Sequence, residues 1–444
     1  MATTFHLISL GCAKNLVDSE VMLGALDAAG YGLENEIEAA DFLIVNTCGF
    51  IQPAVEEAIA EILELVAIKE KYPAKKIVVV GCFVQRYAAS LEEELPEVDL
   101  FVGTEGPTQL GHLLDSLANG SLTEKVVLPN TFLMDSKSPR LLSTPHYRAW
   151  LKITEGCNNR CSYCMIPSIR GILRSRAGDD LVQEALQLEK LGVKELSLIA
   201  QDSTAYGNDL GGNDTLENLM RTLLRETTIP WFRLLYLYPT GVTDTLLDLM
   251  AENDRIVPYL DIPFQHVNDR ILGLMNRPYG YEQLVQLVSN IRSKLPHIAL
   301  RTTFLVGFPG ESESEFLEIE QFLREVRLDH VGVFPYSNEE GCPSEHYRGQ
   351  LDDEVKNQRR DHLLEVQADI SSSIQKKYIG KILPVIVEGV SLETDLLLEG
   401  RTQFQAPEVD GCVYINEGTA SAGDIVNVEI SEAQIYDLVG GIVD

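Results

Sequence analysis

Strand-like and helix-like segments alternate along most of this 444-residue chain, and this alternation limits the fold more than any other feature. In the middle of the chain, six apolar runs are each followed by an amphipathic helical pattern. The expected strands are residues 149–154, 195–200, 232–238, 259–263, 300–307 and 330–336. Repeated strand–helix units predict a parallel sheet that curves into an incomplete (βα)6 barrel. Ligands bind such folds at the carboxyl ends of the strands.

The first part of the chain repeats a similar unit three times, and each expected strand is followed by a cysteine. Strands are predicted at residues 5–10, 41–46 and 76–80, and the cysteines are Cys12, Cys48 and Cys82. Helices are predicted at residues 17–29, 53–69 and 88–94, so the fold class here is a parallel α/β sheet. One buried cysteine is usually only a small apolar side chain. Three at one sheet edge favour a metal site, which we call the N-terminal triad.

Three more cysteines follow the first strand of the predicted barrel within ten residues, in the spacing C-x3-C-x2-C. They are Cys157, Cys161 and Cys164, and we call them the central triad. Closely spaced thiolates suit iron–sulfur clusters. Three thiolates leave one iron of a four-iron cluster open to a ligand, whereas a structural zinc site is closed by four protein ligands. The pattern therefore predicts a reactive cluster at the active end of the barrel.

The remaining segments divide the chain into domains. We expect an N-terminal domain at residues 1–118, a linker rich in turn-forming residues at 119–142 and the barrel at 143–375. A polar helix is expected at residues 350–377. Short β-rich runs at 382–390, 394–399, 412–415 and 425–430 predict a small C-terminal β-barrel within residues 376–444.

The charge and composition of the chain limit the kinds of macromolecule that it is expected to bind. The net charge is −31, and residues 378–444 contain two basic against twelve acidic side chains. Binding of nucleic acid phosphates requires cations, so this segment favours a basic protein partner over RNA, although a merely solvated acidic surface is the alternative. No apolar run approaches the roughly 20 residues of a membrane span. The absence of a signal-peptide pattern and of scattered cysteines predicts a cytoplasmic protein without membrane contact.

The central triad resembles the motif of the radical S-adenosylmethionine enzymes, in which an aromatic residue, here Tyr163, precedes the last cysteine. The resemblance implies a [4Fe–4S] cluster whose open iron is chelated by the methionine portion of S-adenosylmethionine. In that family, reductive cleavage of the cofactor yields a 5′-deoxyadenosyl radical that abstracts a hydrogen atom. The cofactor would supply the difficult chemistry, and the protein its position.

Over nearly its whole length the chain resembles the methylthiotransferases of that superfamily. The resemblance implies that the N-terminal triad holds a second [4Fe–4S] cluster that handles the incoming sulfur, and that S-adenosylmethionine also donates a methyl group. Six segments resemble the branch that modifies the β-carbon of an aspartate in a small-subunit ribosomal protein: 9–20, 166–171, 199–207, 236–239, 260–266 and 333–341. One departure is Cys342, where threonine is expected, and it is not included among the cluster ligands.

Contacts to S-adenosylmethionine are predicted at two places. Gly307, Gly310 and Glu311 follow the fifth barrel strand and resemble the glycine segment with which the family binds the cofactor, although such a segment also suits a simple turn. Gln201 and Asp202 end the second strand and could bind the cofactor's amino or ribose groups, or only cap the strand end.

Two other functions stay open at this stage. The same chemistry could act on tRNA, as in another branch of the family. A different class of protein, a non-catalytic iron–sulfur electron carrier or a zinc-stabilised binding protein, would also use clustered cysteines. The enzymatic interpretation requires a reductant protein and a sulfur source from outside the chain.

Overall fold

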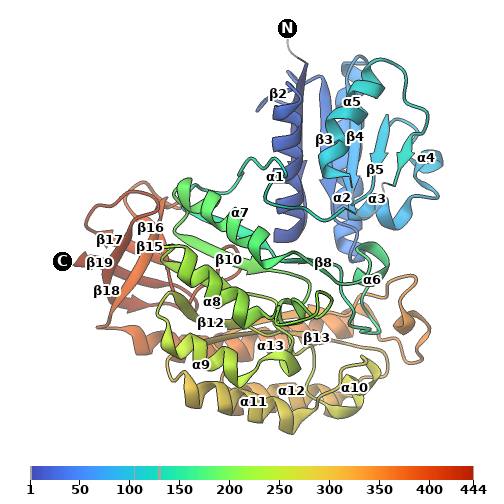
Figure 1. The fold of residues 1–444 in the computed structure, drawn as a ribbon. Helices are drawn as coiled ribbons and strands as arrows, with labels where there is room; N and C mark the ends of the chain where they lie inside the picture. The colour runs from blue at the N-terminus through green and yellow to red at the C-terminus, as the bar shows by residue number, and fades with distance from the viewer. Residues whose placement is uncertain (1–2, 105, 129–131, 444) are drawn as a thin grey trace.

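The computed structural model describes residues 3–104, 106–128 and 132–443, and it places them in three parts (Figure 1). An N-terminal sheet domain stands above a central domain, and a small C-terminal barrel packs against one side of the central domain. The order of parts matches the sequence-based expectation.

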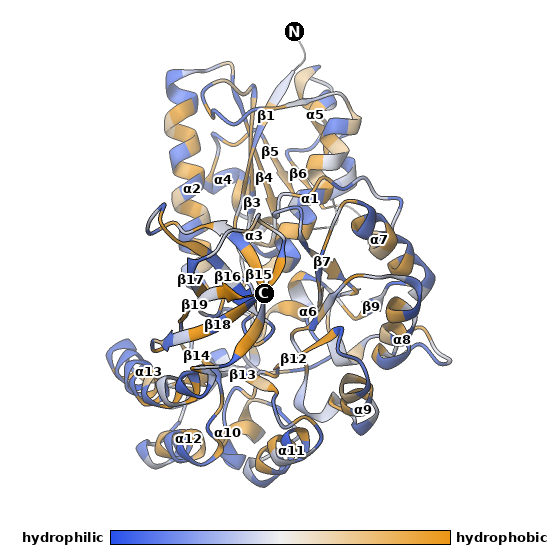
Figure 2. Ribbon diagram, turned by 90° about the vertical axis from the view of Figure 1, so that its left-hand side faces the viewer, coloured by the Kyte–Doolittle hydropathy of each residue, from blue (hydrophilic) through white to orange (hydrophobic). Residues whose placement is uncertain are grey.

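The N-terminal domain is a six-stranded parallel sheet in the order β2-β1-β3-β4-β5-β6. Helix α2 covers one face, and α1 and α5 cover the other (Figure 2). The strands are β1 (Thr4–Ser9), β2 (Gly32–Leu33), β3 (Phe42–Thr47), β4 (Lys76–Gly81), β5 (Leu100–Val102) and β6 (Val126–Val127). The helices are α1 (Ala13–Ala28), α2 (Gln52–Lys71), α3 (Cys82–Tyr87), α4 (Leu91–Glu94) and α5 (Leu110–Ala118). Every residue of β3 is buried, as expected for a parallel strand covered on both faces.

Several details of this domain differ from expectation, and β2, β5 and α5 were not predicted. The helix predicted at residues 88–94 is two short helices, and the first of them begins directly at Cys82. The predicted linker, 119–142, contributes strand β6, which pairs with β5 at the sheet edge. A two-residue edge strand leaves no periodic pattern in a sequence. Residues 129 and 130, which formed part of the predicted linker turn, lie outside the described residues.

The central domain confirms the incomplete barrel. Six parallel strands run in the order β14-β13-β12-β11-β10-β7. Their bounds are β7 (Arg148–Lys152), β10 (Glu195–Ile199), β11 (Trp231–Leu234), β12 (Ile256–Asp261), β13 (Ala299–Val306) and β14 (His330–Pro335). A short hairpin, β8 (Thr154–Glu155) with β9 (Arg174–Ser175), flanks the central triad. The helices are α6 (Ile166–Ile169), α7 (Gly178–Lys190), α8 (Leu216–Glu226), α9 (Asp244–Glu252), α10 (Asp269–Leu274), α11 (Tyr281–Lys294) and α12 (Glu313–Val326).

Strand β11 is shorter than predicted. It ends at Leu234, and Tyr236 has a left-handed backbone with φ of 60°. Such a conformation is strained for a tyrosine, and it turns the chain away from the sheet at the carboxyl edge. The apolar run continues to Tyr238 in the sequence, so periodicity alone extends the strand too far.

The C-terminal part is the expected β-barrel. Helix α13 (Asp353–Gln375) leads into a closed barrel in the order β15-β16-β17-β19-β18. Its strands are β15 (Ile382–Val390), β16 (Leu398–Thr402), β17 (Val413–Glu417), β18 (Ile425–Ala433) and β19 (Leu438–Val443). Sequence reasoning missed β19, which contains Gly440 and Gly441, because glycines weaken a strand pattern.

The C-terminal barrel contacts the central domain where the strands of the central domain begin. Glu195, the first residue of β10, lies between Arg233 of β11 and Arg401 of β16, with 2.6 Å to each guanidinium. His330, the first residue of β14, lies 3.4 Å from Asp410 of the barrel. The barrel therefore covers the amino ends of the central strands, opposite their carboxyl ends.

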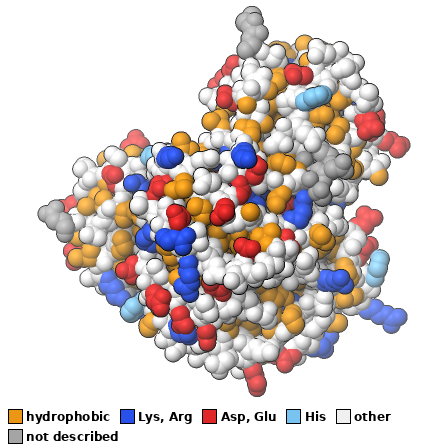
Figure 3. All heavy atoms as spheres, viewed as in Figure 1, with side chains coloured by type: hydrophobic (Ala, Val, Ile, Leu, Met, Phe, Trp, Pro, Cys, Tyr) orange, Lys and Arg blue, Asp and Glu red, His pale blue; other side chains and the backbone are white. Residues whose placement is uncertain are grey.

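The surface charge is uneven. In the part of the barrel that the structure describes, seven acidic residues are exposed, whereas Arg401 is buried in the domain interface and Lys381 is exposed. The exposed acids are Glu393, Asp395, Glu408, Glu417, Asp424, Glu429 and Glu432. The face in Figure 3 carries basic as well as acidic side chains, and the basic ones lie mostly over its central and lower parts. Among the described residues, none of the helices is both long enough and apolar enough to span a bilayer.

Candidate metal and cofactor site

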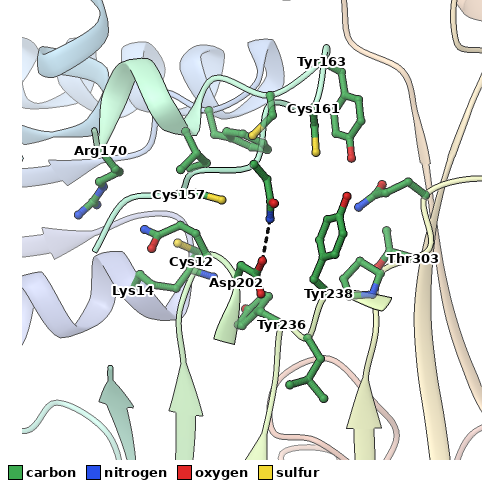
Figure 4. A pocket seen from close by; sticks show the side chains of 18 of the residues that line it. Cys12, Lys14, Cys157, Cys161, Tyr163, Arg170, Asp202, Tyr236, Tyr238 and Thr303 are labelled. Atoms are coloured by element: carbon green, nitrogen blue, oxygen red, sulfur yellow. Dashed lines mark hydrogen bonds between the residues drawn. The ribbon is translucent and has the colours of Figure 1, made fainter. Parts of the chain in front are cut away.

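Both cysteine triads line one cavity of about 370 Å³ between the N-terminal and central domains (Figure 4). The N-terminal triad enters it from the carboxyl edge of the first sheet, and the central triad from the carboxyl edge of the second. Sequence reasoning placed each triad at such an edge, but it gave no reason for the two edges to face each other.

The loops of the N-terminal triad pack tightly against one another. A Cβ atom on Gly11, next to Cys12, would lie 2.8 Å from the Cβ of Cys48. A Cβ atom on Gly49 would lie 2.9 Å from the backbone of Cys82. Only glycine permits these approaches, and Gly11 also has a positive φ of 93°. The two glycines therefore hold the three cysteine loops together.

Buried polar side chains fix the same loops. The Asn15 amide donates to the Leu10 carbonyl oxygen at 2.6 Å, and the Asn46 amide donates to the Asn15 carbonyl oxygen at 2.9 Å. The Thr47 hydroxyl donates to the Val80 carbonyl oxygen at 2.6 Å. These bonds connect α1 to the end of β1, β3 to α1, and β3 to β4, so they hold the segments that carry the cysteines together.

The loop of the central triad is anchored at both ends. The backbone N–H of Cys157 donates to the Gly171 carbonyl oxygen at 3.2 Å, and that of Ser162 donates to the Met275 carbonyl oxygen at 3.1 Å. The Asn159 amide donates to Asp202 at 2.7 Å. Arg277 donates to the hydroxyl of Tyr163 at 2.8 Å, which orients the aromatic residue of the motif.

The cysteines present two sets of three soft sulfur donors to the shared cavity. Among the described residues, no group of three or more Cys, His, Asp or Glu side chains is arranged to hold a single metal ion. In a cubane each thiolate binds a different iron, so its ligands surround a volume instead of a point. Three soft donors on each side of a shared cavity fit two such clusters.

Protonation of the cysteines differs between positions. Burial raises the pKa of Cys82 to about 12 even though Arg170 opposes the shift, and burial raises the pKa of Cys164 to about 12. Burial also acts to raise the pKa of Cys12, but Lys14 and nearby backbone N–H groups outweigh it, so the net shift is downward. Metal binding requires thiolates, so loading the site must release protons from the buried cysteines.

A buried ion network connects the two domains at the wall of the cavity. Arg170 donates to the Cys82 sulfur from two nitrogens, at 3.3 and 3.2 Å, and to Asp18 at 2.6 Å. Lys152 is bound to Asp18 and lies 2.9 Å from Glu155. Asp18 belongs to the N-terminal domain and the other three charged residues belong to the central domain. The network therefore holds the two sheets in register.

The predicted cofactor residues fall into two groups. Gln201 and Asp202 line the cavity, and Asp202 also accepts from the backbone N–H of Thr204 at 3.0 Å, as a strand-end cap would. Gly307, Gly310 and Glu311 are not among the residues that line it. Glu311 accepts from the backbone N–H of Gly307 at 3.0 Å and pairs with Arg359 at 2.5 Å. The segment is thus a braced turn, and its contact with a cofactor stays a prediction.

Several cavity residues were not predicted. Lys14, Tyr236, Tyr238, Gln265 and Arg277 line the cavity with the cysteines. Lys14 lies two residues after Cys12, and Tyr236 lies in one of the segments that resemble the family. Their positions in such segments were the only indication in the sequence that they could belong to the site. Of the basic residues after the central triad, Arg170 lines the cavity, whereas Arg176 is buried against Asp180.

Models of three protein families match the chain in consecutive segments. Residues 4–103 match the uncharacterized protein family UPF0004, 151–323 match the radical SAM superfamily, and 379–443 match the TRAM domain. The three matches correspond to the N-terminal domain, the central domain and the barrel.

Two solved structures share the fold. TsrM, a radical S-adenosylmethionine methyltransferase from Kitasatospora setae, has a TM-score of 0.57 at 14% identity, covering 86% of this chain and 77% of that one. The cobalamin-dependent S-adenosylmethionine radical enzyme OxsB has a TM-score of 0.53 at 12% identity, covering 81% and 56%. At such identities they show the fold alone.

Curated relatives match over nearly the whole chain. The ribosomal protein uS12 methylthiotransferase RimO of Desulfotalea psychrophila (strain LSv54 / DSM 12343) is 63% identical over 99% of this chain and 99% of its own. The RimO protein of Citrifermentans bemidjiense is 46% identical over 99% and 98%. Together with the radical SAM match, these relatives confirm the resemblance to methylthiotransferases. The chain belongs to the RimO family of ribosomal protein uS12 methylthiotransferases.

Proposed function

We propose that this protein methylthiolates the β-carbon of an aspartate in ribosomal protein uS12. The observation that carries the proposal is the shared cavity, in which two cysteine triads from different domains face the same space. A C–H bond on a β-carbon offers no acidic proton and no leaving group. One centre must therefore remove a hydrogen atom and the other must deliver sulfur, and both must reach the same carbon.

In this proposal the central triad holds one [4Fe–4S] cluster and the N-terminal triad holds the other. When bound, the clusters and S-adenosylmethionine supply the 5′-deoxyadenosyl radical, the sulfur atom and the methyl group. The chain's own residues orient these groups and exclude water. Gln201 and Asp202 line the wall beside the central triad, where they would bind the cofactor's polar groups, with Gly307, Gly310 and Glu311 as more distant candidates.

The fixed geometry of the cavity supports separate roles for the two triads in hydrogen abstraction and sulfur delivery. The loops of the N-terminal triad are fixed by close glycine contacts and by Asn15 and Asn46, and the network around Arg170 fixes the distance between the sheets. A radical that must abstract one particular hydrogen requires such pre-organisation, because misplacement of the reacting atoms by about 1 Å can lower a rate by about a hundredfold.

The acidic barrel supports a basic protein as substrate. Seven exposed acids in the described part of the barrel would speed encounter with a basic ribosomal protein and repel tRNA phosphates. Because the barrel lies at the opposite ends of the strands from the cavity, it would act on encounter and not on the chemistry. A reductant protein and a sulfur source complete the partners, in the cytoplasm where ribosomal proteins are made.

Mass spectrometry tests the proposal directly. The anaerobically reconstituted protein, with about eight irons per chain as two clusters require, is incubated with reductant, S-adenosylmethionine and either uS12 or tRNA. A methylthio mass increase on an aspartate of uS12 is expected, with tRNA unchanged. Modification of tRNA and not of uS12 would overturn the choice of substrate. Zinc in place of iron would overturn the chemistry.

A further inference from the structure

Lys14 is a buried cation that lines the shared cavity and contacts an aromatic ring of the other domain. It lies in the first turn of α1 and its side chain is directed into the cavity beside Cys12 and Tyr236 (Figure 4). The residue is only 8% exposed. Its ammonium nitrogen lies 3.3 Å from the centre of the Tyr236 ring, which belongs to the other domain.

The cations that line the cavity differ in their partners. Arg170 is bound to Asp18 and to the sulfur of Cys82. Arg277 donates to the hydroxyls of Tyr163 and Tyr279 and lies over the ring of Tyr238. For Lys14, in contrast, no carboxylate of the described residues lies within 4.0 Å of the ammonium nitrogen. The Cys12 sulfur and the Asp261 carboxylate interact with it only through space, without a direct ion pair. A buried cation that no carboxylate pairs directly is suited to receive an anion.

The carboxylates near Lys14 form hydrogen bonds or ion pairs with other residues. Asp261 pairs with Arg301 at 2.9 Å and accepts from the backbone N–H of Tyr236 at 3.2 Å. Asp202 accepts from Asn159 and from Thr204. The left-handed backbone of Tyr236 holds its ring against Lys14, and a strained conformation of this kind persists where the surrounding structure fixes it.

We propose that Lys14 binds the carboxylate of the target aspartate. This inference rests on the proposed function and specifies how the substrate is recognised. The reacting β-carbon must lie between the two triads, and its carboxylate is bonded directly to it. A cation two residues from Cys12, on the wall that would deliver sulfur, lies where this carboxylate would be held during the reaction. A neutral asparagine would leave Lys14 without a directly paired carboxylate.

The same chemistry could serve another carboxylate, that of the methionine portion of S-adenosylmethionine. The experiment therefore has two arms. The first measures binding of uS12 and of uS12 with the target aspartate replaced by asparagine to the reconstituted protein. The second measures formation of 5′-deoxyadenosine in the absence of uS12. Both are carried out with the wild type and with Lys14→Met.

Lys75→Met provides a matched control. Lys75 is a buried lysine of the same domain, 7% exposed and 5.4 Å from the ring of Tyr72, but it donates to the backbone carbonyl oxygens of Glu38 and Ala40 and does not line the cavity. Iron content and circular dichroism verify that each variant is loaded and folded. Lys14→Arg, which keeps the charge, should retain part of the preference for aspartate.

In the wild type, uS12 with aspartate should bind roughly tenfold or more tightly than the asparagine form, as expected for a charge-assisted contact. Lys14→Met should reduce this preference to within about twofold, whereas Lys75→Met retains it, and 5′-deoxyadenosine formation stays the same. A preference that survives in Lys14→Met, or is absent from the wild type, overturns the inference. Loss of 5′-deoxyadenosine in Lys14→Met assigns the cation to the cofactor instead. If the wild type neither binds nor modifies uS12, the proposed function itself fails.

Discussion

Glu195 offers a quantitative test of how the barrel is attached to the central domain. Its carboxylate is completely buried between Arg233 of the central domain and Arg401 of the barrel. Burial acts to raise the pKa of Glu195, but Arg401 and Arg233 outweigh it and lower the pKa from 4.5 to about 2. One pKa unit corresponds to about 1.4 kcal/mol, so ionisation of Glu195 favours the folded state by about 3 kcal/mol.

Glu195→Gln removes this charge and leaves two guanidinium groups facing a neutral amide. We expect the free energy of barrel opening to fall by about 3 kcal/mol, at the low end of the range for breaking a buried ion pair. Because the folded pKa is depressed, the contribution is complete above the unfolded value of 4.5 and is lost only as the pH falls toward 2. The effect should therefore be constant between about pH 6 and 9.

Hydrogen exchange of the holoprotein measures this quantity locally. Faster exchange is expected in peptides from β15–β19, with less change in the N-terminal sheet. Glu226→Gln is the matched control, because Glu226 forms an exposed pair with Arg225 and should change stability by less than about 0.5 kcal/mol. A loss below about 1 kcal/mol for Glu195→Gln, or one equal to the control, would refute the reasoning.

The remaining predictions concern the cavity. Alanine at any cysteine of the central triad should abolish 5′-deoxyadenosine formation, and formation at the wild-type rate would contradict the assignment. Alanine in the N-terminal triad should spare that cleavage but stop methylthiolation, which mass spectrometry of uS12 would show; persistent product would disprove a sulfur-handling role. Arg170→Met removes two N–H donors from the Cys82 sulfur. Hydrogen bonds to ligand sulfurs help set cluster potentials, so the second cluster's reduction potential should fall in an EPR-monitored titration. An unchanged potential would show that Arg170 only holds the domains together.

Much of the architecture follows from local sequence patterns. Strands such as β3 and β10 are recognisable because both faces of a parallel sheet are buried. The rule that ligands lie at the carboxyl edge of such sheets placed both triads correctly at strand ends. The sequence also predicted the acidic character of the C-terminal barrel. Because Arg401 is buried against Glu195, the exposed surface of the barrel is more acidic than the sequence alone indicates.

Features that depend on contacts between distant segments could not be predicted. Arg170 follows the central triad in the sequence, yet it is buried against Cys82, which is 88 residues away. Lys14 becomes a cavity residue only because α1 faces the carboxyl edge of a second sheet. The turn at Tyr236 is hidden within an apolar run, since its positive φ is imposed by tertiary structure and not by a turn-forming residue.

The charges between the domains indicate how the cavity can and cannot change. Asp18 and Glu155 are balanced by Lys152 and Arg170, and all four side chains are at least nine-tenths buried. Separating the two sheets would expose two of the pairs and leave Arg170 without its contact to Cys82. Wide opening of this interface would therefore break several direct contacts at once. The target side chain therefore enters a preformed cavity. Its recognition depends on buried charges that line this cavity, such as Lys14.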